Sequence, residues 1–171
     1  MVLALSRITT PLGTMVAVAD DTCLYLLAFE DQQDLAQELE KLAAQTRAKI
    51  TPGSNTITQK ISHELNAYFA GKLTTFTTPV KLLGTPFQHK VWQALQTVPF
   101  GKTVSYAQIA QVIGAPTSFR AVANANGANR LPVLIPCHRV IKSDGDICGY
   151  NGGLSRKAWL LEHEQNKSKR P

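Results

Sequence analysis

The stretch that says most about this chain is residues 131–141, which read Leu-Pro-Val-Leu-Ile-Pro-Cys-His-Arg-Val-Ile. Its first five residues form an apolar run that predicts a short buried strand, with Pro132 tolerated near the start. If Pro136 begins a single helical turn, Cys137 lies among unpaired backbone N–H groups, whose partial positive charge favours a thiolate over a thiol. The stretch therefore predicts a reactive sulfur held at the end of a rigid element.

The neighbours of Cys137 bear on whether it is reactive or structural. A buried, inert thiol is the commonest state of a free cysteine. Apolar packing, however, gives no reason to place His138 and Arg139 beside the sulfur, and both would further favour the thiolate. Successive residues of a strand point to opposite faces, so we expect Cys137 and His138 to be coupled through a water or a third group. The candidate third group is Glu164.

Upstream of this stretch, the sequence predicts two short helices joined by a tight turn. Ser105 can cap a helix over residues 106–113, and a Gly-Ala-Pro sequence supplies the turn. Thr117 or Ser118 then caps a second helix over residues 119–126. The pattern is typical of a helix-turn-helix, and also of helical hairpins in proteins that never bind DNA.

The second of these helices carries almost no bulk around Arg120. Its small residues are Ala121, Ala123, Ala125 and Gly127. Such a surface permits close approach to nucleic acid or to a neighbouring helix, and the sequence leaves both interpretations open.

The rest of the chain predicts a two-lobed α/β protein with a mostly helical C-terminal lobe. The N-terminal lobe, residues 1–80, is expected to be a small antiparallel sheet with helices. A connector rich in threonine spans residues 74–84, and Thr85 opens a helix that ends at Val98. We expect the second domain over residues 84–166 and a disordered basic tail over residues 167–171.

Within the N-terminal lobe, the hydrophobic pattern changes period along the chain. Strands are predicted over residues 3–10, 15–19 and 24–29, with polar turns between them. From Asp34 the apolar spacing becomes helical, and a second helix fits residues 56–70.

Charge is distributed unevenly over the 171 residues, whose net charge is +6. Residues 1–80 carry six basic and eight acidic side chains, whereas residues 81–171 carry twelve and four, which gives −2 and +8. This asymmetry favours a polyanionic partner for the second half, although a basic surface that only aids solubility fits equally well. The ordinary composition, 44% hydrophobic and 18% charged, argues against a disordered, collagen-like or coiled-coil chain.

The cysteines and the first residues indicate the compartment. Cys23, Cys137 and Cys148 are too few and too irregularly spaced for a disulfide framework, which predicts a reducing environment. Cys148 itself reads either as a small apolar filler or as a second oxidisable thiol. With neither a signal peptide nor a membrane-spanning stretch in the pattern, we expect a cytoplasmic protein, or a nuclear one in a eukaryote.

These motifs together resemble the O6-alkylguanine-DNA alkyltransferases, also called methylated-DNA-protein-cysteine methyltransferases. The resemblance covers residues 84–164 and begins from the Ile-Pro-Cys-His-Arg-Val signature at 135–140. Its supporting motifs are Gly84-Thr85-Pro86-Phe87-Gln88, Val91-Trp92, Ser105-Tyr106, Arg120-Ala121-Val122, Gly149-Tyr150 and Gly152-Gly153-Leu154. The N-terminal lobe matches only by length and strand-helix order, and the resemblance implies a ribonuclease H-like fold for it.

The resemblance also implies a mechanism. Cys137 would accept the alkyl group from guanine O6 in DNA, and from O4-alkylthymine as a second candidate substrate. The thioether product has no carbonyl for water to attack, so each molecule would act once. His138 would activate the thiol through a bridging water, with Glu164 holding the imidazole, and Asn129 would order the preceding turn. Tyr106 would hydrogen-bond the base and donate a proton to it.

The implied partner is double-stranded DNA, bound by a monomer through the minor groove. The damaged nucleotide must leave the stack to reach a buried thiol, and Arg120 would fill the space that it vacates. A phosphate or carboxylate partner for Arg120 is the other interpretation. The remaining DNA-contact candidates are Thr117, Ser118, Ala121, Ala125 and Gly127.

The implied base and alkyl pocket has its walls near the end of the domain. Its candidates are Val140, Tyr150, Asn151 and Gly152, and the alkyl size that fits would be tuned by Asn151 and Asn126. Some family members hold a structural zinc in the N-terminal lobe, but here Cys23 and His63 lack a paired spacing, so we expect no metal and no cofactor. One departure from the family pattern is Arg130, which stands where many relatives carry proline.

Two other functions remain compatible with parts of the sequence. A regulator that binds DNA through the helix-turn-helix would leave Cys137 incidental, prefer one operator sequence and form a dimer. A cysteine hydrolase would need multiple turnovers and an oxyanion site, for which the sequence offers no candidate.

Overall fold

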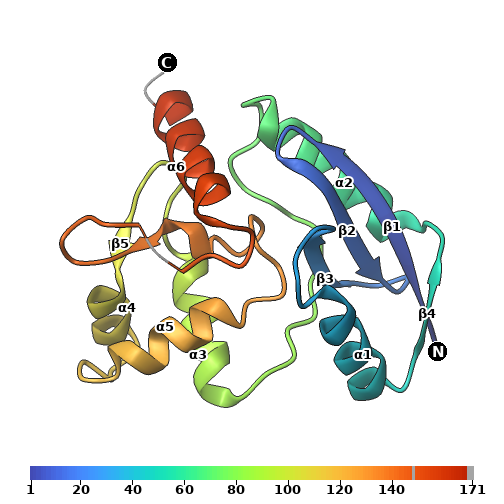
Figure 1. Ribbon diagram of the computed structural model, residues 1–171, viewed down its shortest axis with the longest axis horizontal. Helices are drawn as coiled ribbons and strands as arrows, with labels where there is room; N and C mark the ends of the chain where they lie inside the picture. The colour runs from blue at the N-terminus through green and yellow to red at the C-terminus, as the bar shows by residue number, and fades with distance from the viewer. Residues whose placement is uncertain (148, 169–171) are drawn as a thin grey trace. The chain divides into compact units, whose positions relative to one another are not determined.

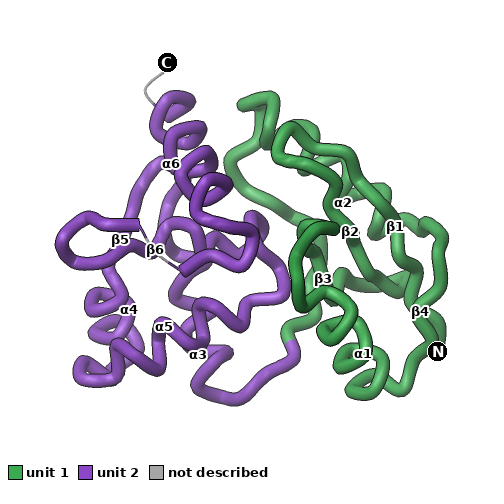
Figure 2. Tube along the Cα trace, viewed as in Figure 1, with its two compact units in different colours: residues 1–82 green, residues 83–171 purple. Residues whose placement is uncertain are grey.

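The computed structural model describes residues 1–147 and 149–168 of the chain. It divides into two compact units, residues 1–82 and 83–171 (Figure 2). Cys148 and residues 169–171, to which the sequence assigned a filler or oxidisable thiol and part of a disordered tail, lie outside the described residues.

The N-terminal unit is built on a four-stranded sheet of order β3-β2-β1-β4 (Figure 1). Its strands are β1 (Val2–Thr10), β2 (Gly13–Ala19), β3 (Leu24–Phe29) and β4 (Lys49–Pro52). The first three form the predicted antiparallel meander, but β4 pairs parallel to β1. The expectation of a purely antiparallel sheet is therefore wrong in this detail. A four-residue strand ending in proline has too little alternation to be detected from sequence.

Two helices complete the N-terminal unit, α1 (Leu35–Thr46) and α2 (Thr56–Phe69). A reciprocal capping box opens α2: the Asn55 side chain accepts from the Thr58 N–H at 2.9 Å, and the Thr58 hydroxyl accepts from the Asn55 N–H at 2.8 Å. The predicted apolar face of α2 is buried, and the helix packs on β1 and β2.

The C-terminal unit is mostly helical, as predicted (Figure 1). Its helices are α3 (Pro86–Gln96), α4 (Tyr106–Val112), α5 (Phe119–Gly127), the single 3-10 turn η1 (Cys137–Arg139) and α6 (Leu154–Ser168). Strands β5 (Val104–Ser105) and β6 (Val140–Ile141) form one short parallel pair. The helix-turn-helix is present as α4 and α5, which pack on each other, while α5 also packs on α3.

Three local predictions in this unit are corrected. The apolar run from Leu131 to Ile135 is a buried turn rather than a strand: the Ile135 N–H donates to the Leu131 carbonyl at 2.8 Å, and Val133 has a φ of 73°. Apolar residues cover the core equally well in a turn as in a strand, so the apolar run alone cannot distinguish a buried turn from a buried strand. Ser118 precedes α5 but makes no side-chain capping hydrogen bond. Helix α6 continues through Ser168, so the start of the expected disordered tail is helical.

Membrane-spanning helices and clusters of metal-binding side chains are both absent from the described part of the chain. No helix among residues 1–147 and 149–168 is long and apolar enough to cross a membrane. Within the same residues, no group of three or more His, Cys, Asp or Glu side chains is arranged to hold a metal ion.

Candidate active site

Cys137 is the first residue of η1 and is only 5% exposed. Its N–H donates to the Ile135 carbonyl at 2.7 Å, and its carbonyl accepts from the Asn126 side chain at 3.3 Å. Burial raises the pKa of the thiol to about 11, and it outweighs the opposing effects of the Asn129 amide and the Lys157 charge. The predicted thiolate is therefore wrong for the resting protein, because the N–H is already paired and desolvation dominates.

His138, Arg139 and Glu164 form a buried cluster that joins η1 to α6. His138 Nε2 lies 2.7 Å from one Glu164 oxygen, while Arg139 Nε donates to the other at 2.7 Å. Arg139 also donates to the Val98 carbonyl at 2.7 Å. The Arg139 charge is therefore neutralised by Glu164 and does not serve the Cys137 thiol, contrary to the sequence interpretation.

The charges in this cluster follow from burial and pairing. Burial alone would raise the pKa of Glu164, but its contacts with His138 and Arg139 outweigh burial and hold that pKa well below its usual range. Burial lowers the pKa of His138, despite the opposing effect of Glu164. A neutral imidazole that faces a carboxylate carries its proton on Nε2, which leaves a lone pair on Nδ1. His138 Nδ1 is buried and has no hydrogen-bond partner in the structure.

Asn129 spans the turn that leads to Cys137. Its side-chain amide donates to the Ile135 carbonyl at 2.9 Å, and its side-chain oxygen accepts from the Leu131 N–H at 2.9 Å. Both bonds lie within the segment between α5 and η1, so Asn129 fixes the backbone that presents the sulfur.

Lys157, on α6, is fully buried and was not singled out from the sequence. Its ammonium donates to the Val140 carbonyl at 2.6 Å, and its charge acts on the Cys137 thiol. A usable signal existed in the helical spacing, because Lys157 shares a face with buried Leu160 and Glu164. A lysine on an apolar helix face needs a partner, and here the partner lies at the active-site segment.

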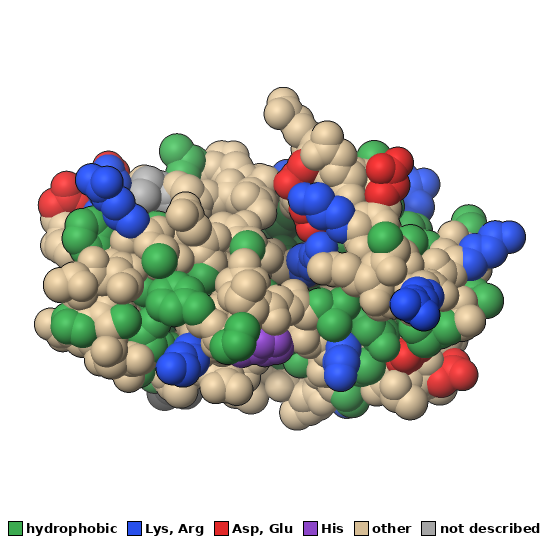
Figure 3. Space-filling view, turned by 90° about the horizontal axis from the view of Figure 1, so that it is seen from below, with side chains coloured by type: hydrophobic (Ala, Val, Ile, Leu, Met, Phe, Trp, Pro, Cys, Tyr) green, Lys and Arg blue, Asp and Glu red, His purple; other side chains and the backbone are tan. Residues whose placement is uncertain are grey.

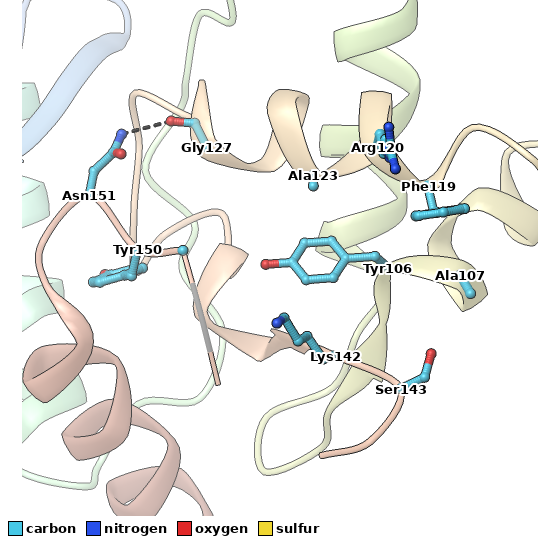
Figure 4. Close-up of a pocket in the computed structure, with 11 residues that line it drawn as sticks. Tyr106, Ala107, Phe119, Arg120, Ala123, Gly127, Lys142, Ser143, Tyr150 and Asn151 are labelled. Atoms are coloured by element: carbon cyan, nitrogen blue, oxygen red, sulfur yellow. Dashed lines mark hydrogen bonds between the residues drawn. The ribbon is translucent and has the colours of Figure 1, made fainter. Parts of the chain in front are cut away.

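A cavity of about 760 Å³ opens in the C-terminal unit (Figure 4), and neither Cys137 nor the cluster of His138, Arg139 and Glu164 is among the residues that line it. The residues that line it are Tyr106, Ala107, Phe119, Arg120, Ala123, Gly127, Lys142, Ser143, Gly149, Tyr150 and Asn151. Asn151 is anchored by a 2.7 Å hydrogen bond to the Gly127 carbonyl. Burial raises the pKa of Tyr150, whose hydroxyl is buried without a partner.

Two of the four residues predicted for the pocket wall do not line this cavity. Val140 is fully buried in β6, and Gly152 lies outside the cavity lining and accepts a hydrogen bond from Arg156. Asn126, predicted to tune the alkyl size, is buried, does not line the cavity and donates to the Cys137 carbonyl. Lys142 and Phe119 line the cavity but were not predicted.

The predicted DNA-contact residues are mostly exposed. Arg120, Ala121, Gly127 and Thr117 are exposed and Ser118 is half-buried. Ala125 is the exception: it is buried, and its carbonyl accepts the Trp92 indole N–H at 2.9 Å. Its smallness serves the packing of α5 on α3, so its assignment as a DNA contact is corrected. On the face seen in Figure 3, Lys and Arg side chains lie singly among apolar and polar surface.

The fold and the site together define a class of protein: an α/β protein of two units that buries a cysteine next to a histidine-glutamate pair and has an open cavity in the same unit. Two family models match the chain. Residues 5–82 match the ribonuclease-like domain of 6-O-methylguanine DNA methyltransferase, and residues 86–166 match its DNA binding domain.

Known proteins agree with these models. The methylated-DNA-protein-cysteine methyltransferase of Mycobacterium leprae is 40% identical over 158 residues, 92% of this chain and 90% of that protein. The Salmonella typhimurium protein of the same name is 40% identical over 165 residues, which are 92% of this chain and 93% of that protein. The solved O6-methylguanine methyltransferase of Mycobacterium tuberculosis superposes with a TM-score of 0.83 at 39% identity, covering 99% of this chain and 95% of that one.

The chain belongs to the 6-O-methylguanine DNA methyltransferase family. The resemblance found from the C-terminal motifs is confirmed, and it extends to the N-terminal half, where the motifs were weakest.

Proposed function

We propose that this protein repairs O6-alkylguanine in double-stranded DNA by transferring the alkyl group, irreversibly, to the Cys137 sulfur. The observation that carries the proposal is the buried Cys137 turn beside neutral His138, whose Nδ1 has no partner. The family supports the chemistry, because its curated members are named for methyl transfer from DNA to a protein cysteine. A Mycobacterium tuberculosis relative, 39% identical, was solved in complex with DNA.

The proposed reaction is an in-line displacement at the alkyl carbon. The bond from Cys137 Sγ to carbon forms as the bond from carbon to guanine O6 breaks, and the electron pair leaves with the guanine. Because the pKa of the thiol is raised to about 11, the proton must be removed during the reaction. His138 Nδ1 is the acceptor, reached through a bridging water, and Glu164 stabilises the imidazolium that forms.

The cavity is the proposed site for the extruded base. Tyr106 begins α4 and lines the cavity, and its hydroxyl lies near Gly149. A Cβ atom added to Gly149 would lie 3.7 Å from that hydroxyl oxygen. From this position it donates a hydrogen bond to the guanine and a proton as the leaving purine gains negative charge. Tyr150 and Asn151 form the opposite wall (Figure 4).

DNA binding is proposed to place α5 in the minor groove, with the protein acting as a monomer. Arg120 is exposed on α5 and lines the cavity, so it stands where an extruded nucleotide would leave a gap in the duplex. Its planar guanidinium can stack on the remaining bases. The exposed small residues Ala121 and Gly127 allow the helix to approach the backbone closely.

Turnover is proposed to stop after one event. A dialkyl sulfide offers water no carbonyl to attack, and nothing in the described cluster supplies a nucleophile stronger than water for it. The protein is consumed by the repair.

The test is an intact-protein mass measurement after mixing with a duplex that contains O6-methylguanine. We expect a gain of one methylene on the unmodified protein, saturating at one per chain, and no gain on Cys137→Ser. Binding of the duplex by folded protein without any adduct would contradict the proposal and favour a non-catalytic DNA-binding module.

A further inference from the structure

The parallel pair of β5 and β6 leads directly into two residues that line the cavity, Tyr106 and Lys142. Val104 pairs with Val140 and Ser105 with Ile141. Tyr106 follows Ser105 as the first residue of α4, and Lys142 follows Ile141, so each of the paired strands ends directly before a residue that lines the cavity. Both residues line the cavity, and Figure 4 shows the Lys142 nitrogen on the side of the hydroxyl end of Tyr106.

The backbone of Lys142 is fixed, while its side chain is exposed. Its N–H donates to the Asp146 carbonyl at 2.9 Å, and its carbonyl accepts from the Gly145 N–H at 2.9 Å. The Asp144 carboxylate in the same loop accepts from the Asp146 N–H at 2.9 Å. The loop therefore holds its shape through backbone bonds and does not depend on the ammonium group.

The charge of the cavity is unbalanced. Of the described residues that line it, Lys142 and Arg120 are cationic and none carries a carboxylate. Arg120 is proposed above to enter the duplex, which leaves Lys142 as the cation that stays with the base. A cation on the wall of a cavity whose lining has no acidic residue suits a ligand that becomes negative there.

The proposed displacement creates such a ligand. As the bond from the alkyl carbon to O6 breaks, its electron pair spreads over the guanine ring, and the base is anionic until a proton reaches it. Bound DNA would cover the cavity and exclude water, which strengthens the attraction between an ammonium and this anion.

We infer that Lys142 stabilises the departing guanine anion, as a cationic group of the base cavity beside Tyr106. This inference rests on the proposed function. Lys142 neither gives nor accepts a proton in the step: the thiol proton goes to His138, the base takes its proton from Tyr106, and Lys142 contributes charge alone.

The experiment compares three variants under single-turnover conditions with a duplex containing O6-methylguanine. Lys142→Met keeps the length of the side chain without its charge, and Lys142→Arg keeps the charge. Lys102→Met removes the same charge from an exposed lysine of the same unit that does not line the cavity. The rate constant is measured at saturating protein, and the duplex dissociation constant is measured for each variant in the Cys137→Ser background.

We expect Lys142→Met to lower the saturating rate about tenfold, with Lys142→Arg restoring most of it and Lys102→Met leaving it unchanged. Thermal melting checks that each variant is folded. A saturating rate within twofold of the unmodified protein would overturn the inference; weaker binding with a shallower salt dependence would then assign Lys142 to a DNA phosphate. An equal fall of the saturating rate in Lys142→Met and Lys142→Arg would also overturn the inference, because the arginine keeps the charge. Absence of any adduct on the unmodified protein is a different result, because it removes the proposed function itself.

Discussion

Each unit buries one glutamate, and the two are used differently. In the N-terminal unit, Glu64 accepts from the backbone N–H groups of Thr77 and Thr78 at 2.9 Å each and from both threonine hydroxyls. In the C-terminal unit, Glu164 binds the ionisable side chains of His138 and Arg139. Glu64 thus holds the backbone segment that leads out of its unit, whereas Glu164 holds the ionisable side chains of His138 and Arg139.

The two units also differ in how many buried polar atoms lack a hydrogen-bond partner. Within the described residues, three buried side-chain atoms have no hydrogen-bond partner: Asn126 Oδ1, His138 Nδ1 and the Tyr150 hydroxyl. All three belong to the C-terminal unit and lie on segments that surround Cys137. Unpaired buried polar atoms are costly, so their concentration at one place marks where a substrate or water completes the site. Among its described residues the N-terminal unit has no such atom, which agrees with a scaffolding role for Glu64.

The largest expected effect comes from removing one charge in each unit. Glu164→Gln would lower the alkyl-transfer rate on the order of 10³-fold, because the carboxylate fixes the His138 tautomer and stabilises the imidazolium. Glu64→Gln would change that rate less than about twofold, although both variants would lose about 2–4 kcal/mol of unfolding free energy. Single-turnover kinetics and urea unfolding measure the two effects. Equal losses of rate would break the comparison.

The next effect separates DNA handling from chemistry within the C-terminal unit. Arg120→Ala would slow repair of duplex DNA on the order of 10²-fold, because extrusion of the base loses its support. Reaction with free O6-benzylguanine, which needs no extrusion, would stay within about threefold. The two rates are measured on the same preparation. If both fall equally, Arg120 belongs to the fold.

A smaller effect contrasts one cysteine from each unit. Cys23 is half-buried, whereas burial raises the pKa of Cys137 to about 11, so a smaller fraction of Cys137 than of an ordinary thiol is thiolate at pH 8. We expect iodoacetamide to label Cys23 at least about tenfold faster. Peptide mapping by mass spectrometry gives the two rates. Faster labelling of Cys137 would mean that its thiol is activated before substrate binds.

The smallest effect concerns the response of the two units to acid. The folded pKa of His138 lies below its ordinary value of 6.5, and that of Glu64 lies below 4.5. In both cases the folded state binds fewer protons than the unfolded state, so stability is lost as the pH falls below those ordinary values. The C-terminal unit should weaken from about pH 6.5, by on the order of 1 kcal/mol per pH unit, and the N-terminal unit only below about 4.5. Hydrogen exchange measured between pH 7 and 5 reports the stability of each unit separately. If the N-terminal unit lost its protection at a higher pH than the C-terminal unit, the prediction would be contradicted.

The sequence predicted the elements whose signals are local. The capping residues Thr85 and Ser105, the meander of β1 to β3 and the apolar face of α2 are all where the pattern placed them. The link from His138 to Glu164 was also anticipated, through the family resemblance, and the structure brings the two together.

What the sequence missed depends on contacts between distant residues. Arg139 looked like an activator of Cys137 because it is near in sequence, but its charge is taken up by Glu164, 25 residues away. The state of the thiol follows from burial, which no local pattern reports. Lys142 became part of the cavity only through β5 and β6, two strands of two residues each that are too short for a period to be seen.

One bond described above gives this protein a built-in optical probe. The Trp92 indole N–H donates to the backbone of α5 at Ala125, on the helix that carries Arg120. The other tryptophan, Trp159, lies on α6 and stacks on His163 of the same helix, with ring centroids 4.8 Å apart. Intrinsic emission from Trp92 would therefore follow small displacements of α5 as DNA engages, without any attached dye.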